Sequence, residues 1–110
     1  APHEAAVEEA FMKNNAASAI KLGHARAACL LAASTSGLDV GEYSPRSVKK
    51  SVVGTGAADK AQVAHMMNVL MPGCGVSCGV KAGDASDALA IAICHGHRVK
   101  AAGTLYRRSA

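Results

Sequence analysis

Two short apolar stretches separated by a helical segment set the strongest limit on what this chain can fold into. Residues 4–8, EAAVE, follow Pro2 and predict a strand that ends at Glu8. Between about residues 16 and 34, apolar and small residues recur at three- and four-residue steps, which predicts a helix. Residues 38–44, LDVGEYS, predict a second strand. This order predicts a βαβ unit with parallel strands and a right-handed crossover.

The helical segment between the strands carries further predictions. Asn14 or Asn15 stands just before it and is expected to supply the N-cap. Gly23 in mid-helix costs about 1 kcal/mol relative to alanine, and close packing against another backbone is the usual reason for such a glycine. Cys29 lies within this helical pattern and Cys94 within a later one, so both are predicted to be buried, reduced thiols.

Three more helices are predicted after the second strand. The dipeptide SP at 44–45 is typical of a helix start, and the short helix that it begins ends before the GTG segment at 54–56. A second helix is expected from about 58 to 71, and a third from about 84 to 97. The predicted fold class is therefore α/β, a βαβ unit followed by three helices.

The composition limits the core and the partners. Aromatic residues make up 3% of the chain, so alanine, valine, leucine, isoleucine and methionine must fill the core. The formal net charge of +4 permits a polyanionic partner without requiring one. The sequence has no run of 18 apolar residues, so no membrane partner is expected, and an intracellular location is predicted.

Asp84 and Asp87 stand three residues apart at the start of the last predicted helix. A single acid there is explained by capping and by the positive end of the helix dipole. Two acids on one face repel each other, and a divalent cation would remove that repulsion. Glu8, at the end of the first predicted strand, is a third carboxylate of the kind that Mg²⁺ binds. Such acidic clusters support two-metal cleavage of phosphodiester bonds.

A zinc site is a weaker interpretation of other residues. Cysteine and histidine are suitable zinc ligands, but the candidate residues lack a paired CxxC motif. Incidental thiols in a loop and a buried Cys94 are therefore the favoured explanation. His24 and His65 are expected to be polar residues of helix surfaces, and a place beside the acids is the less favoured interpretation for His95 and His97. The zinc set would comprise Cys74, Cys78, Cys94, His95 and His97.

Two further segments are compatible with nucleic acid. The GTG segment at 54–56 lacks the phosphate-loop patterns and is best explained as a turn, although Lys50 and Lys60 beside it would allow a nucleic-acid backbone to approach. The YRR segment at 106–108 is either a solvated terminus or an arm on RNA or DNA, since arginine binds phosphate and tyrosine stacks on bases.

Three segments of the chain resemble the RuvC family of bacterial Holliday-junction resolvases. In chain order these are AAVEEAFMKNNAASAIKLGHARAACLLAA, EYSPRSVKKSVVGTGAADKAQVAHMM and AGDASDALAIAICHGH, which together extend over about residues 2–97. The resemblance implies a partial RNase H-like fold. It also implies a homodimeric endonuclease of DNA recombination and DNA repair, which cuts two symmetrical bonds of a four-way DNA junction with Mg²⁺ or Mn²⁺.

The resemblance also implies roles for particular residues. Glu8, Asp84 and Asp87 match the catalytic, metal-binding acids of the family. Phe11 matches its aromatic residue beside the junction centre, and Lys49 and Lys60 match its DNA-facing basic residues. With the other basic residues, these form the expected nucleic-acid surface, which binds phosphates and stacks on a base: Phe11, Lys49, Lys50, Lys60, Arg107 and Arg108.

The chain departs from the family pattern at one catalytic position. The first catalytic aspartate of the family stands in an N-terminal strand with an IDPG-like motif, which these 110 residues do not contain. Three explanations stay open. The chain is a fragment, or one half of a split resolvase whose protein partner supplies the missing strands. Otherwise it is a catalytically inactive structural or nucleic-acid-binding subunit of a large ribonucleoprotein such as an organellar ribosome, with RNA as its partner.

The predicted domain organisation follows from the same resemblance. Residues 1–97 are expected to form a RuvC-like domain lacking its N-terminal strands, and residues 98–110 a basic tail. The expected location is the bacterial cytoplasm or the mitochondrial matrix.

Overall fold

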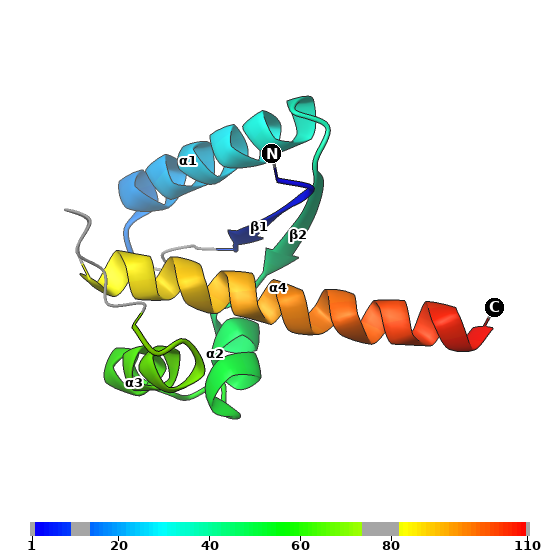
Figure 1. Cartoon of the computed structure of the whole chain (residues 1–110). Helices are drawn as coiled ribbons and strands as arrows, with labels where there is room; N and C mark the ends of the chain where they lie inside the picture. Colours follow the sequence, from blue (N-terminus) through cyan, green and yellow to red (C-terminus); the bar gives the residue numbers. More distant parts are fainter. Residues whose placement is uncertain (1, 10–13, 74–81, 110) are drawn as a thin grey trace. The chain divides into compact units, whose positions relative to one another are not determined.

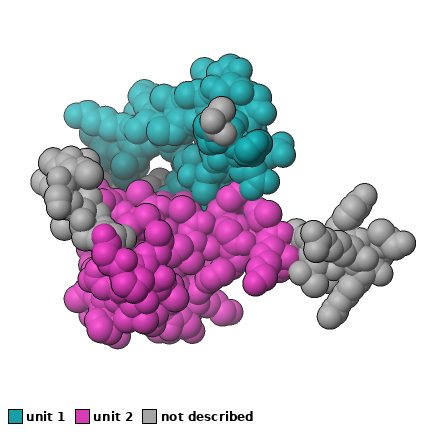
Figure 2. Space-filling view, in the orientation of Figure 1, with its two compact units in different colours: residues 1–45 teal, residues 46–110 magenta. Residues whose placement is uncertain are grey.

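The computed structural model describes residues 2–9, 14–73 and 82–109 (Figure 1). The chain divides into two compact units, residues 1–45 and residues 46–110, which Figure 2 distinguishes by colour. The first unit is a βαβ unit and the second is built from helices, which confirms the predicted α/β order. The elements in chain order are β1 (Glu4–Glu8), α1 (Ala16–Thr35), β2 (Asp39–Tyr43), α2 (Pro45–Val53), α3 (Lys60–Leu70) and α4 (Ala82–Ser109).

The two strands of the first unit are parallel, as predicted. Their register pairs Glu4 with Asp39 at one end and Glu8 with Tyr43 at the other. The backbone N–H of Glu9 also donates to the Tyr43 carbonyl at 2.8 Å, which continues the pairing one residue beyond β1. Parallel strands need a crossover connection, and α1 supplies it.

Helix α1 begins where Asn15 caps it. The Asn15 side-chain oxygen accepts a hydrogen bond from the backbone N–H of Ser18 at 3.1 Å, so Asn15 is the cap of the two asparagines considered. The side of α1 that carries Leu22 and Leu30 is half-buried. A second side is open, with Ile20 58% and Leu31 66% exposed.

Of two predictions about α1, the one for Gly23 is not met within the described chain and the one for Cys29 is wrong. A Cβ atom built on Gly23 meets nothing within 4 Å, so no described backbone packs closely against this glycine. Cys29 is exposed rather than buried. Small and apolar residues occur on several sides of α1, so periodicity alone does not tell which side faces the sheet.

The second unit has a core shared by its three helices. The buried Cys94 confirms the prediction for that thiol, and its Sγ atom lies 4.0 Å from the Ser47 carbonyl oxygen of α2. Helix α3 begins with a capping box, in which Asp59 and Gln62 bind each other's backbone N–H groups at 2.8 Å. The buried residues of this core are Val48, Val52, Ala58, Val63, Met67, Ala90 and Cys94.

Helix α4 differs from its predicted limits at both ends. It begins at Ala82, so Asp84 lies inside its first turn instead of capping it. It continues to Ser109, although an end near His97 was predicted. The segment after His97 lacks proline and contains good helix formers, so the glycine at 96 is a tolerated interior residue and not a stop. None of the described helices combines the length and apolar character needed to cross a membrane.

Candidate functional site

Glu8 stands at the carboxyl end of β1, in the first unit. Side chains alternate between the two faces of a strand, and the register places Val7 beside Glu42 and Glu8 beside Tyr43. Arg26 of α1 forms an ion pair with Glu42, so α1 lies over the face that carries Val7. Glu8 and Tyr43 therefore project from the face opposite α1. Tyr43 is buried there, and Glu8 is half-buried.

The Arg26–Glu42 ion pair is a feature that sequence reasoning missed. It joins α1 to β2 through side chains that are 35% and 40% exposed. The Nε atom of Arg26 is buried and has no hydrogen-bond partner among the described residues. A usable signal exists in the sequence, since Arg26 lies four residues from both Leu22 and Leu30, on the half-buried side of the helix. A charged residue at such a position calls for a partner on the sheet.

Asp84 and Asp87 lie on α4 in the second unit. The i, i+3 spacing places them on one side of the helix, as predicted, with Asp84 exposed and the side chain of Asp87 43% exposed. Lys60, in the first turn of α3, places its Nζ atom 4.0 Å from the Oδ2 atom of Asp87. The structure thus brings two predicted catalytic acids and one predicted DNA-facing lysine together at the adjoining starts of two helices.

The donor chemistry of these acids fits a divalent cation. Two carboxylates one helical turn apart are oxygen ligands of the kind that Mg²⁺ and Mn²⁺ prefer. The Lys60 ammonium is the one cation that the described residues place within ion-pair distance of these acids. Within residues 2–9, 14–73 and 82–109, no group of three or more His, Cys, Asp or Glu side chains is arranged to hold a metal ion. Glu8, the third predicted ligand, belongs to the other unit.

Three basic residues share one side of α2, together with the half-buried Val53 at its end. Arg46, Lys49 and Lys50 follow an i, i+3, i+4 spacing and share this side, while Val48 and Val52 are buried in the core. Arg46 and Lys50 are exposed, and Lys49 is half-buried. Two of the predicted nucleic-acid residues therefore lie together, next to an arginine that was not among them.

The remaining predicted residues divide into two groups. Phe11 lies outside the described residues, as do Cys74 and Cys78 of the zinc interpretation. Arg107 and Arg108 lie in α4, but the structure describes only their backbone.

His97 contacts a serine of α2 and not one of the residues of the zinc or acidic site. Its Nδ1 atom lies 2.9 Å from the Ser51 hydroxyl, a hydrogen bond that links α4 to α2. Cys94 points its thiol toward the Ser47 carbonyl in the same interface. Both side chains therefore contribute to packing between these helices.

Comparison with known proteins identifies relatives that match most of the chain. The family model described as crossover junction endodeoxyribonuclease RuvC matches residues 1–95. The chain is 64% identical over 100 residues to the crossover junction endodeoxyribonuclease RuvC of Maricaulis maris. This match covers 91% of this chain and 57% of the Maricaulis maris protein. It is 57% identical over 94 residues to the protein of the same name from Caulobacter sp. strain K31, with 86% and 53% covered.

Solved structures give the same result for the fold. The structure of Thermus thermophilus RuvC in complex with Holliday junction substrate matches with a TM-score of 0.76 and 35% identity, covering 92% of this chain and 59% of that one. A further Thermus thermophilus RuvC structure matches with a TM-score of 0.73. The predicted partial RNase H-like, RuvC-type fold is therefore confirmed. The chain spans between half and three fifths of the length of these relatives.

Proposed function

The chain belongs to the RuvC family of crossover junction endodeoxyribonucleases, and we propose that it contributes Glu8, Asp84 and Asp87 to metal-dependent cleavage of four-way DNA junctions. The observation that carries the proposal is the acid pair of α4, held beside Lys60. The helix dipole explains one acid at the start of α4 but not a mutually repelling pair, whereas phosphodiester cleavage needs both acids and a cation near the phosphate.

Each residue has a proposed role in this reaction. The three carboxylates would hold the metal, and Mg²⁺ or Mn²⁺ bound there would supply water activation and charge stabilisation. Lys60 offers its ammonium group to the phosphate near Asp87. Phe11 stacks on a base beside the junction centre. The other basic residues bind the phosphate backbone and account for salt-dependent affinity: Lys49, Lys50, Arg107 and Arg108.

Cleavage of a labelled four-way junction by the intact protein tests the proposal. Glu8→Gln and Asp87→Asn should each lower the cleavage rate roughly 100-fold or more, since even outer-shell partners of a metal contribute 10–100-fold. Glu9→Gln is the matched control, because Glu9 is an exposed acid just beyond β1. Unchanged cleavage by the Asp87→Asn protein would refute the assignment of the acids.

The competing function is a structural or nucleic-acid-binding subunit without catalysis. The relatives that we compared are named as bacterial endonucleases and give no support to an organellar ribosome or to mitochondria. We place the protein in the bacterial cytoplasm, where such an enzyme meets chromosomal DNA. Junction binding without cleavage by the intact protein, in Mg²⁺ and in Mn²⁺, would instead favour the subunit.

We also propose that a second copy of the chain covers the open side of α1. Ile20 and Leu31 are exposed, and the intervening Gly23 leaves room for close approach of another helix. Two copies would supply the two active sites that symmetrical cleavage needs. Leu31→Glu should convert the dimer to a monomer in light scattering, whereas Val69→Glu, at a similarly exposed apolar residue of α3, should not. A dimer that persists in Leu31→Glu would exclude this interface.

A further inference from the structure

The side chain of Arg46 rests directly on Gly56. A Cβ atom built on Gly56 would lie 2.4 Å from the Cγ atom of Arg46, 3.1 Å from its Nε atom and 3.3 Å from its Cδ atom. Contacts as short as 2.4 Å do not occur, and Cγ is too near the backbone to move without a new rotamer of the whole side chain. Any residue larger than glycine at position 56 therefore displaces Arg46.

The turn that carries Gly56 is well defined. The N–H of Gly54 donates to the Lys50 carbonyl at 3.0 Å, and the N–H of Ala57 donates to the Thr55 hydroxyl at 3.3 Å. Gly54 has a φ of 95°, which favours glycine, and Ala58 is buried. Gly56 has no positive φ. The glycine at 56 is therefore explained by its contact with Arg46, and the glycine at 54 by its backbone conformation.

The position of Arg46 is electrostatically unfavourable within the protein. It lies in the first turn of α2, where the helix dipole favours anions, and that turn contains no acidic residue. Lys49 and Lys50 lie on the same side and repel it. None of the ion pairs or hydrogen bonds between described residues involves these three side chains. A bound anion would relieve both the repulsion and the unfavourable dipole.

We propose that Arg46, seated on Gly56, binds a backbone phosphate of nucleic acid together with Lys49 and Lys50. The identity of the nucleic acid, a DNA junction, rests on the proposed function, but the site is separate from the acids of α4. A planar guanidinium can form bidentate contacts with a phosphate. Because the Arg46 side chain already packs against the turn, it loses less conformational entropy when it binds a phosphate. The competing explanation is that the aliphatic part of Arg46 merely packs on the turn.

Salt-dependent binding of the intact protein to a labelled four-way junction separates these explanations. EDTA prevents cleavage, and the salt concentration is varied from about 50 to 200 mM, the range over which phosphate contacts are usually resolved. Arg46→Gln should make the slope of log K against log salt shallower by about 0.9, the value for one lost phosphate contact. The corresponding loss of affinity at 50 mM salt is roughly three- to tenfold.

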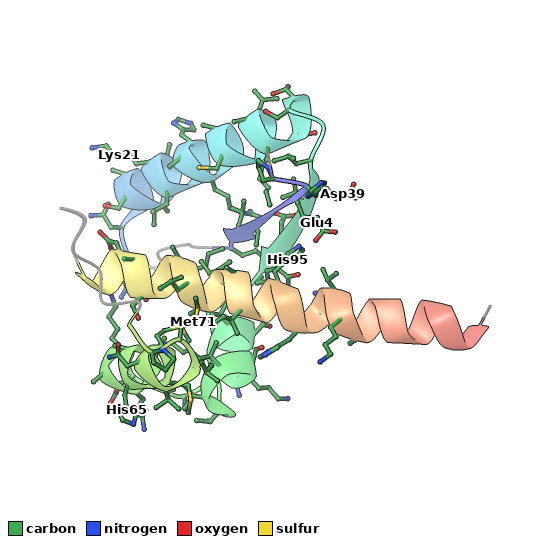
Figure 3. The ribbon with its side chains drawn as sticks, in the orientation of Figure 1. Glu4, Lys21, Asp39, His65, Met71 and His95 are labelled. Carbon is green, nitrogen blue, oxygen red and sulfur yellow. The ribbon has the colours of Figure 1, made fainter. Side chains whose placement is uncertain are left out.

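Gly56→Ala provides the decisive comparison. It should reproduce the shallower slope of Arg46→Gln, and the double variant should show no further loss, because both changes remove the same contact. Gly54→Ala strains a backbone with positive φ but leaves Arg46 in place, so it should lower stability and keep the slope. Lys21→Gln removes a cation from α1, in the other unit, and should also keep the slope (Figure 3).

Three results would overturn the proposal: an unchanged slope in Arg46→Gln, an unchanged slope in Gly56→Ala, or additive losses in the double variant. Failure of the proposed function looks different. In that case Asp87→Asn cuts as well as the parent, or the parent does not cut, whatever the slopes of the Arg46 and Gly56 variants.

Discussion

Lys60 and Asp87 join the starts of α3 and α4 through a 4.0 Å contact between Nζ and Oδ2. The lysine side chain is 84% exposed and the aspartate side chain 43% exposed. Exposed ion pairs of this kind stabilise a fold by about 0–1 kcal/mol. The contact between Lys60 and Asp87 therefore adds little to the stability of the second unit, and its main effect is on the charges that these two side chains present to a ligand.

Lys60→Gln should accordingly separate stability from activity. We expect the free energy of unfolding, measured in urea, to change by less than about 1 kcal/mol. Junction cleavage should fall by tenfold or more, because a cation beside the reacting phosphate is lost. Lys21→Gln, at an exposed lysine of α1, should change neither quantity. A loss of several kcal/mol in Lys60→Gln would show that the lysine is mainly structural.

Two methionines at the same end of α3 offer a direct test of the core of the second unit. Met67 is 2% exposed, whereas Met71, labelled in Figure 3, is 42% exposed. Met67→Ala should lower the free energy of unfolding by about 2–5 kcal/mol, because it leaves a cavity. Met71→Ala should lower it by less than about 0.5 kcal/mol. Equal losses, measured by urea denaturation, would contradict this assignment of the core.

The N-terminus of α1 contains a matched pair of asparagines. Asn15 accepts the Ser18 N–H, whereas Asn14 is an exposed residue just before the cap. Asn15→Ala should cost about 1 kcal/mol of unfolding free energy, and Asn14→Ala should be close to neutral. Thermal unfolding followed by circular dichroism measures both. The opposite order of the two losses would place the cap at Asn14.

The predictable parts of the fold are those with local causes. Asn15, the SP dipeptide at 44–45 and the short apolar stretch of Glu4–Glu8 act within a few residues of themselves, so the βαβ unit and its cap could be inferred from the sequence. The pairing of the acids on α4 is equally local, since an i, i+3 spacing fixes a helix face. The seat of Arg46 on Gly56 is not local, because it depends on the turn that follows α2.

Other features were missed for the same physical reason. The Arg26–Glu42 ion pair depends on which side of α1 meets the sheet, and this is decided by packing. The exposure of Cys29 follows from the same choice. Helix α4 is longer than predicted because the good helix formers after His97 extend it past Gly96. Where local sequence signals are of similar strength, as for the side of α1 that meets the sheet, packing with the rest of the fold decides the structure.

A divalent cation should stabilise the intact protein through Asp84 and Asp87. At a Mg²⁺ concentration ten times the dissociation constant, the free energy of unfolding should rise by about 1.4 kcal/mol. Asp84→Asn and Asp87→Asn should each reduce this rise. Without Mg²⁺, Asp87→Asn should change stability by less than about 0.5 kcal/mol, because relief of repulsion by Asp84 and loss of the Lys60 ion pair oppose each other.

Asp59→Asn is the control for this cation effect. It removes one negative charge from the same unit and keeps the N-cap of α3, since asparagine caps as well as aspartate. Its Mg²⁺ response in thermal unfolding, at constant ionic strength, should equal that of the parent protein. If all three variants lost the response equally, Mg²⁺ would be acting on the acidic residues in general and not at the acid pair of α4. A response lost only with Asp84 or Asp87 would locate the cation at the acid pair of α4.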